Sequence, residues 1–281
     1  MKVKITSDST CDLSAELLEK YDVSTVPLYV GLGERFGRDG VEITPADIYA
    51  YAESTGSVPT TSAVNVEDYV ALFRRWVGEG YSVVHFCIGE KFSSSYRNAL
   101  LAAESVGDVS VVDSANLSTG QGLLVLLAAE LAAEGKSANE IVEACTAAVS
   151  RLETSFVIDS MEYLRRGGRC SALTAFGANL LKIKPCIDLI DGVLEPTHRY
   201  RGRFDQVLLQ YVDQRLQNRQ DVDTRRIFVV HTRCAPGFVD AVVSRVRELV
   251  PDAGEILVAE AGATITTHCG PNTLGVMFLR K

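Results

Sequence analysis

The sequence lacks several features that would place it in common classes of protein. Its seven cysteines are scattered and form no C-x-x-C pair, so neither a zinc site nor a redox dithiol is indicated. No apolar run approaches the roughly 18 residues of a membrane-spanning helix, and the first residues lack the apolar core of a signal peptide. We therefore expect a cytoplasmic protein with no stable membrane insertion, no metal and no cofactor.

An excess of positive charge is also missing. The net charge is −8 and the isoelectric point is near 5.1, which argues against a nucleic-acid-binding protein because a phosphate footprint needs clustered Lys and Arg. No G-x-x-x-x-G-K-[ST] loop is present. Gly31, Gly33 and Gly37 nearly imitate a dinucleotide fingerprint, but the spacing is too long and a charged turn follows. We interpret the glycines as a flexible hairpin or flap.

Residues 87–98, CIGEKFSSSYRN, show the most informative pattern. An apolar strand ends there, and Ser93, Ser94 and Ser95 precede a helical pattern. In an open α/β sheet, such turns lie at the carboxyl ends of strands, where the start of a helix presents unpaired N–H groups and favours anions. The pattern indicates a site for a small anionic group. Alternatively, one serine is a helix cap and the others are solvated.

Two other turns are rich in hydroxyl groups. Residues 7–10 follow a strand at 3–6 and include the carboxylate of Asp8. Thr60, Thr61 and Ser62 form a third polar loop, before a helix that Asn65 can cap. Each turn is explained equally well by local capping, so the sequence alone leaves both readings open.

Strands and helices alternate over the first half of the chain. Strands are expected at 3–6, 23–30, 83–88 and 109–112, with helices between them and two more helices up to about residue 152. This order predicts an α/β domain with a doubly wound parallel sheet over residues 1–153. Residues 154–281 are expected to form an α+β domain with a mixed sheet, because Asp191 and Gly192 mark a hairpin turn between apolar runs.

Basic residues concentrate between positions 165 and 203 of this acidic chain. They are Arg165, Arg166, Arg169, Lys182, Lys184, His198, Arg199, Arg201 and Arg203. Such a run is usually a solvated face, but its density here also fits a surface that docks an anion or a partner. Further along, His268 stands between Thr266, Thr267 and a Gly270-Pro271 turn, where the backbone can approach a ligand closely.

Five segments of the chain resemble motifs of the DegV family, in the order in which that family has them. They are PTTSAVNVEDY, KFSSSYRNA, VVDSANLSTGQG, FVIDSMEYLRRGGRCSA with NLLKIKPCIDLIDG, and THCGPNTLGVMF. The chain departs from the usual family pattern at Gly89 and Glu90, where the family often has two serines, and at Asn272, where it has glycine.

The resemblance implies two domains, α/β and α+β, that together enclose one long-chain fatty acid in a tunnel. It implies that Ser93, with Thr61 or Ser62, hydrogen-bonds the fatty-acid carboxylate, while His268 comes close to the head group. Thr60, Ser94 and Thr267 are further candidates for ligand contacts.

The resemblance also implies a role in bacteria. The protein would be the non-catalytic lipid-binding subunit that presents the carboxylate to a separate ATP-dependent fatty-acid kinase, which makes acyl-phosphate for phospholipid synthesis. We expect the kinase to dock on Arg165, Arg166, Arg169, Arg201 and Arg203.

A competing hypothesis is a serine-dependent esterase or lipid hydrolase, with Ser93 as nucleophile and His268 as base. The sequence disfavours it, because no G-x-S-x-G elbow surrounds Ser93 and no third member of a triad is identifiable. A nucleotide-dependent enzyme is a further reading, and it lacks a phosphate-binding motif.

Overall fold

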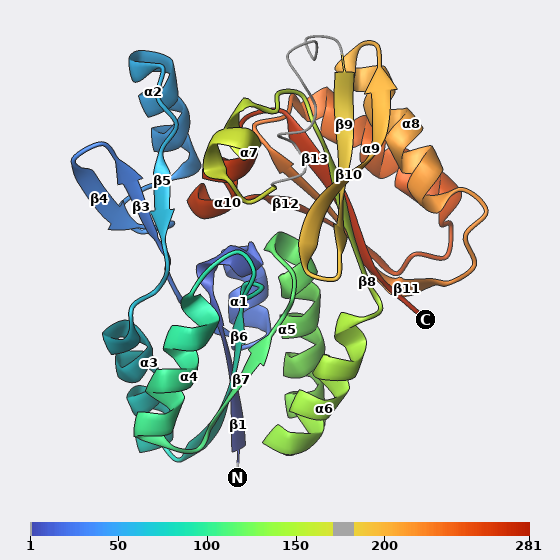
Figure 1. Cartoon of the computed structure of the whole chain (residues 1–281). Coiled ribbons are helices and arrows are strands. Elements are labelled where there is room, and N and C mark those ends of the chain that lie inside the picture. Colours follow the sequence, from blue (N-terminus) through green and yellow to red (C-terminus); the bar gives the residue numbers. More distant parts are fainter. Residues whose placement is uncertain (1, 171–182) are drawn as a thin grey trace. The chain divides into compact units, whose positions relative to one another are not determined.

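A computed structural model describes residues 2–170 and 183–281 of the chain (Figure 1). Lys182, one of the expected basic residues, lies outside this range. The chain divides into two compact units that are not contiguous in sequence. The first consists of residues up to Thr44, Pro59–Ser150 and Gly262–Thr264; the second consists of Pro45–Val58, Arg151–Ala261 and Ile265–Lys281. The expected domain boundary near residue 153 stays a prediction.

The first unit is built on a parallel sheet with the strand order β2-β1-β6-β7. Its strands are β1 (Lys2–Asp8), β2 (Ser24–Val26), β6 (Tyr81–Cys87) and β7 (Val109–Asp113). Its helices are η1 (Ser9–Cys11), α1 (Ala15–Lys20), α3 (Val66–Gly78), α4 (Ser95–Val106), α5 (Ser118–Ala133) and α6 (Ala138–Val149). Helices α3 and α4 cover one face of the sheet, and α5 and α6 cover the other (Figure 1). The prediction of an α/β unit with a doubly wound parallel sheet is confirmed.

The helix starts in this unit follow the capping signals in the sequence. The side chain of Asn65 accepts a hydrogen bond from the backbone N–H of Asp68 and caps α3. Ser137 and Glu140 form a reciprocal capping box at the start of α6. Helix α3 then packs Tyr69 and Phe73 into the core, where both are fully buried.

A small antiparallel sheet, with the order β4-β3-β5, also belongs to the first unit. Its strands are β3 (Tyr29–Leu32), β4 (Arg35–Arg38) and β5 (Thr60–Ser62). The expected hairpin at the glycines is confirmed, because β3 and β4 pair through a turn in which Gly33 has a φ of +67°.

Two expectations about this region were wrong. The single strand expected at 23–30 is two strands in different sheets, and Pro27 between them has no N–H to continue a ladder. The polar loop expected at Thr60–Ser62 is β5, which pairs with β3. A strand of three hydroxyl residues is recognisable only through the distant partner that supplies its hydrogen bonds.

The second unit contains a mixed sheet with the order β10-β9-β8-β13-β11-β12. Its strands are β8 (Leu152–Ile158), β9 (Ile183–Ile190), β10 (Val193–Arg201), β11 (Val222–Thr232), β12 (Glu255–Glu260) and β13 (Thr273–Arg280). Its helices are α2 (Pro45–Thr55), α7 (Glu162–Gly167), α8 (Phe204–Leu216) and α9 (Pro236–Leu249), and α10 (Ala263–Cys269) starts in the first unit and continues into the second.

The predicted hairpin is confirmed, with Asp191 and Gly192 at φ values of +49° and +73° between β9 and β10. The predicted α+β class with a mixed sheet is confirmed too.

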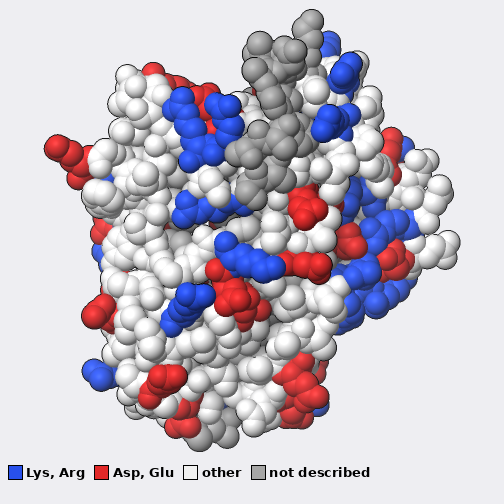
Figure 2. Space-filling model, viewed as in Figure 1, with Lys and Arg blue, Asp and Glu red and all other residues white. Residues whose placement is uncertain are grey.

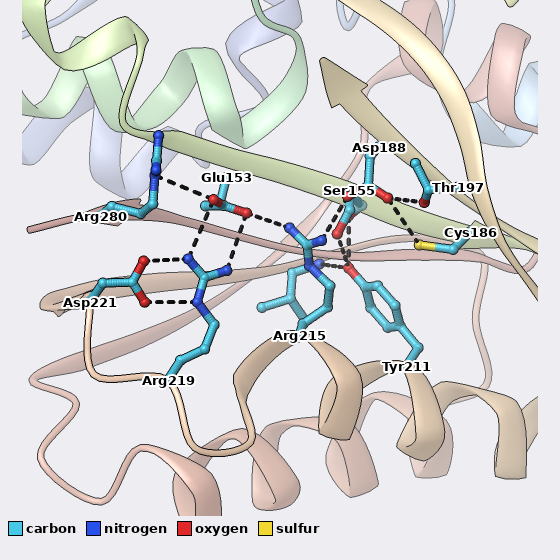
Figure 3. Close-up of polar contacts among 11 residues, drawn as sticks. Glu153, Ser155, Cys186, Asp188, Thr197, Tyr211, Arg215, Arg219, Asp221 and Arg280 are labelled. Atoms are coloured by element: carbon cyan, nitrogen blue, oxygen red, sulfur yellow. Dashed lines mark hydrogen bonds and ion pairs between the residues drawn. The ribbon is translucent and has the colours of Figure 1, made fainter.

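Helix α8 is fastened to the sheet by polar contacts as well as by apolar packing (Figure 3). Tyr211 is fully buried, donates to the carbonyl of Ser155 at 2.8 Å and accepts from the backbone N–H of Val276 at 2.8 Å. One turn further on, Arg215 contacts Glu153 at 2.6 Å and Asp188 at 2.7 Å. These contacts join α8 to the three strands β8, β9 and β13.

The segment that carries His268 is a helix, Ala263–Cys269, and His268 lies in its last turn. The sequence did not predict this helix. Threonines lower intrinsic helix propensity, and three of the helix residues are threonines, namely Thr264, Thr266 and Thr267. The helix ends at the Gly270-Pro271 turn that the sequence predicts, where Gly270 has a φ of +69°.

Candidate functional site

The serine turn follows the carboxyl end of β6, as the sequence predicts. Its backbone is held by acceptors from other parts of the first unit. Ile88 N–H donates to Asp8 Oδ2 at 2.8 Å, Gly89 N–H donates to the carbonyl of Asn116 at 2.8 Å, and Glu90 N–H donates to Asp113 Oδ1 at 3.1 Å. Glu90 itself is exposed, so its side chain adds little to the turn.

The backbone of the turn is satisfied before the helix begins. The N–H groups of Ile88, Gly89, Glu90 and Phe92 all donate to protein acceptors. Helix α4 starts at Ser95, and the expectation that its first N–H groups favour an anion stays a prediction.

The three serines of the turn differ sharply in environment. Ser93 is half-buried, and its Oγ accepts a hydrogen bond from the backbone N–H of Ser95 at 3.2 Å. Ser94 is exposed and occupies the N-cap of α4 without a capping hydrogen bond from its side chain. Ser95 is fully buried in the first turn of the helix. Ser93 is therefore the turn residue whose hydroxyl is both fixed and partly accessible.

The hydroxyl residues of β5 point in alternating directions. Thr61 is half-buried and pairs with Val30, whereas Thr60 and Ser62 are exposed. Because successive strand side chains point to opposite faces, Thr61 and Ser62 cannot both face one ligand group. Asn98 in α4 donates to the carbonyl of Val64 at 2.7 Å, which ties the helix of the serine turn to the segment that follows β5.

A network of buried carboxylates and hydroxyls lies at the carboxyl end of β1. Asp8 accepts hydrogen bonds from Thr10, Gln121 and Ile88, and burial raises its pKa to about 6. The sequence identified the Asp8 turn as a candidate site. Gln121 was not recognisable as part of it, because no local pattern links position 121 to Asp8.

Two further aspartates of the first unit hold the start of α10. Asp12 accepts from the backbone N–H of Gly262 at 2.9 Å and from the hydroxyl of Ser118 at 2.5 Å. Asp39 accepts from the N–H of Ala263 at 2.8 Å. Sequence reasoning missed both residues, since nothing local links them to a segment so far along the chain.

His268 belongs to the second unit and is packed tightly. Burial, and secondarily the positive charge of Arg169, lowers the pKa of its imidazole to about 4. A Cβ atom added at Gly167 would lie 2.3 Å from Nδ1 of His268, so only glycine leaves room for the ring. Thr267 beside it is buried. The imidazole is consequently neutral at physiological pH and can act as a hydrogen-bond donor or acceptor rather than a cation.

The expected docking arginines all lie in the second unit and are exposed. Arg165 and Arg166 are in α7, Arg169 follows it, Arg201 ends β10, and Arg203 caps α8. Figure 2 shows Lys and Arg side chains gathered over α7, whereas positive and negative side chains are mixed near β11. Three of the basic residues are paired in ion contacts, Arg166 with Glu162, Lys184 with Asp159 and Arg203 with Asp205.

All seven cysteines are buried thiols within the described part of the chain. Across residues 2–170 and 183–281, no group of three or more His, Cys, Asp or Glu side chains is arranged to hold a metal ion. In the same ranges, no helix combines the length and the apolar character needed to cross a membrane.

Fold and polar turns together define a two-unit α/β protein, with hydroxyl residues at the carboxyl edge of a parallel sheet and a neutral histidine in the unit with the mixed sheet. The chain belongs to the DegV family, because the family model described as "Uncharacterised protein, DegV family" matches residues 2–281.

Individual relatives match over nearly their whole length. A protein of Thermotoga maritima described as a fatty acid-binding protein is 32% identical over 284 residues, covering 98% of this chain and 96% of that protein. A DegV domain-containing protein of Streptomyces coelicolor is 32% identical, covering 98% and 97%. A solved structure of a DegV family protein from Thermus thermophilus, described by its fatty-acid binding, is 32% identical with a TM-score of 0.87, covering 100% of both chains.

Proposed function

We propose that this protein binds one long-chain fatty acid in a tunnel and holds its carboxylate through Ser93, together with Thr61 or Ser62, and through His268. The observation that carries the proposal is the half-buried, fixed hydroxyl of Ser93 at the carboxyl end of a parallel strand. The fatty-acid binding described for the relatives from Thermotoga maritima and Thermus thermophilus supports it. No cofactor is needed for this function.

Of the two β5 candidates, Thr61 fits the role better than Ser62. Thr61 is half-buried like Ser93, whereas Ser62 and Thr60 are exposed on the opposite face of the strand. Ser94 is likewise exposed, and Thr267 is buried beside His268. We therefore place Thr60 and Ser94 outside the set that binds the carboxylate.

The affinity for such a ligand would come mainly from its tail. Burial of an alkyl chain contributes about 0.8 kcal/mol per CH₂ group, or on the order of 10 kcal/mol for a long chain before the costs of binding are subtracted. A charge-assisted hydrogen bond to the carboxylate contributes roughly 1.5–3 kcal/mol. The head group thus fixes the orientation of the ligand, and the tail supplies most of the binding free energy.

We further propose that the protein is non-catalytic and presents the bound carboxylate to a separate ATP-dependent fatty-acid kinase in the cytoplasm. The kinase would make acyl-phosphate for phospholipid synthesis. Arg165, Arg166, Arg169, Arg201 and Arg203 would form the docking face, because they are exposed cations in an otherwise acidic protein. Arg169 also acts electrostatically on His268, which links this face to the proposed head-group residue within the second unit.

A serine hydrolase fits the geometry less well. A general base works best when its pKa lies near the working pH, and the pKa of His268 is lowered to about 4 by burial. The hydroxyl of Ser93 contacts Ser95 rather than a histidine among its described partners.

The proposed function can be tested by identifying the lipid that copurifies with the protein. Protein purified from cells would be extracted with organic solvent, and the extract would be quantified by mass spectrometry. We expect a fatty acid at close to one molecule per chain. Protein that carries no fatty acid, and that takes none up from a solution of palmitate, would contradict the proposal.

A further inference from the structure

Strand β5, which carries Thr61, is short and lies at the edge of its sheet. It has three residues, and in the described part of the chain its neighbour in the order β4-β3-β5 is β3. A short edge strand makes few backbone hydrogen bonds. Pairing with Val30 sets Thr61 within the small sheet, whereas Ser93 follows a strand of the parallel sheet. The placement of Thr61 relative to Ser93 therefore depends on contacts other than strand pairing.

One such contact joins the segment after β5 to helix α4. Nδ2 of Asn98 donates to the backbone carbonyl oxygen of Val64 at 2.7 Å. Val64 is fully buried and lies three positions after Thr61. Asn98 lies five positions after Ser93, and all four residues belong to the first unit. The two candidate hydroxyls are thus connected through one side-chain hydrogen bond and two short stretches of chain.

Both stretches of chain are fixed by their surroundings. Asn98 lies in the first turn of α4, just after Ser93 and the N-cap, so the offset between Asn98 and Ser93 is largely that of a regular helix. On the other side, Val64 is packed into the core cluster that α3 and α4 share, and Asn65 directly after it caps α3. A displacement of Val64 would therefore also displace Thr61.

We propose that Asn98 is a positioning residue for the carboxylate site. Its hydrogen bond to the carbonyl of Val64 holds Thr61 where the threonine can donate to the same carboxylate as Ser93. The inference rests on the proposed function and deepens it, because it assigns the head group to a two-point contact rather than to Ser93 alone. A carboxylate has two acceptor oxygens, so each hydroxyl can bind one of them.

The hydrogen bond defines this position more sharply than apolar packing does. Apolar contacts are non-directional, so the cluster around Val64 leaves room for small shifts of the chain. A hydrogen bond of 2.7 Å requires its donor to lie close to the lone-pair directions of the carbonyl oxygen. A carbonyl oxygen only accepts, so the amide of Asn98 must present Nδ2 to it. The side chain is therefore held in one orientation.

The test measures the contribution of Thr61 to palmitate binding with and without the amide of Asn98. Isothermal titration calorimetry on delipidated protein would compare the wild type, Thr61→Val, Asn98→Leu and the double variant. Thr61→Val alone should weaken palmitate binding about tenfold, because one charge-assisted hydrogen bond is lost. In the Asn98→Leu protein, the same substitution should change the affinity less than about twofold, because Thr61 is already displaced.

Ser93→Ala separates this specific loss from general damage to the fold. It should still weaken binding about tenfold in the Asn98→Leu protein, because the serine turn keeps its own backbone hydrogen bonds. The matched control is Ser105→Ala, which removes a side-chain hydrogen bond to the carbonyl of Ala102 in the same helix and should leave the contribution of Thr61 unchanged. If Asn98→Leu does not fold, Asn98→Ala serves instead, because alanine favours helices.

Four results would overturn the inference and leave the proposed function intact. Thr61→Val could cost the same with and without Asn98, or cost nothing in the wild-type protein. Asn98→Leu could reduce the contributions of Ser93 and Thr61 alike, or Ser105→Ala could abolish the contribution of Thr61 as well. Wild-type protein that binds no palmitate would instead contradict the proposed function, and this inference with it.

Discussion

Asp12 and Gly262 are joined by a hydrogen bond of 2.9 Å, although 250 positions separate them in the chain. The carboxylate also accepts from Ser118, and both contacts lie inside the first unit. Burial raises the pKa of Asp12 to about 8, and the hydrogen bonds from Ser118 and Gly262 only partly offset this effect. The folded protein therefore holds a proton here that the unfolded chain has already lost at neutral pH.

The stability of the protein should fall as pH rises from 6.5 to 8. A carboxyl group whose folded pKa is raised above 3.8 binds more protons in the folded state, so it destabilises the fold progressively up to about pH 8. The buried histidines act in the opposite direction only below pH 6.5, because the pKa of His85 is lowered to about 3 and that of His268 to about 4. Denaturant titrations at several pH values would measure the slope, which is at most about 1.4 kcal/mol per pH unit for one proton.

Asp12→Asn should remove most of this slope. An amide resembles a protonated carboxyl group, since it can accept from the Gly262 N–H and donate to the Ser118 oxygen. Asp240→Asn, at an exposed position in α9, is the control and should leave the slope unchanged. A slope that persists in Asp12→Asn would show that another group is responsible.

Removing Ser93's hydroxyl should weaken binding without unfolding the protein. In Ser93→Ala, the carboxylate loses one charge-assisted hydrogen bond, so the dissociation constant for a long-chain fatty acid should rise about 10- to 100-fold. Isothermal titration calorimetry on delipidated protein would measure it, with Ser94→Ala as the neighbouring control. Equal affinity for the fatty acid in Ser93→Ala and Ser94→Ala would show that Ser93 does not bind the carboxylate.

Arg215 should be the most costly arginine of the second unit to remove. Its guanidinium contacts Glu153 and Asp188, and the three side chains are only 14–21% exposed (Figure 3). Arg215→Met would leave Asp188 without its ion partner in a largely buried setting, while Glu153 keeps Arg219 and Arg280, so we expect the free energy of unfolding to fall by roughly 2–4 kcal/mol. Arg203→Met breaks an exposed pair with Asp205 and should cost less than about 1 kcal/mol. Similar losses in the two variants would contradict this assignment.

If the proposed docking face binds a fatty-acid kinase, charge reversal there should affect the kinase step and spare lipid binding. In Arg169→Glu with Arg201→Glu, acyl-phosphate formation by the partner kinase should fall at least about tenfold, and the difference should shrink at high salt. The affinity for fatty acid should remain that of the wild-type protein.

The control for this experiment is Arg75→Glu in α3, an exposed arginine outside the proposed face. If the paired reversal leaves acyl-phosphate formation at the level of Arg75→Glu, the kinase docks elsewhere.

Local signals in the sequence predicted much of this fold. Asn65 and Ser137 mark helix starts, Asp191-Gly192 marks a hairpin, and alternating strands and helices define the parallel sheet. Each of these depends on residues close together in the chain.

What the sequence did not reveal depends on distant partners. β5 is a strand because β3 pairs with it, and α10 is a helix despite its threonines. The same holds for the site: Ser93 and the Asp8 turn were recognisable locally, whereas Asp39 was not, since its partner at position 263 lies far along the chain. Ser95 is buried in the first turn of α4, which packs against α3, and this burial also depends on distant residues.

Gly167 and His268 should be linked in the evolution of this family. A Cβ at position 167 would lie 2.3 Å from the imidazole, so a side chain there is compatible only with a smaller residue at position 268 or a displaced ring. Relatives that keep the histidine are therefore expected to keep the glycine, and those that have lost the histidine are free to vary at both positions. An alignment of many members would reveal this as covariation, and the pair would then distinguish lineages that retain the proposed histidine contact to the head group from those that have lost it.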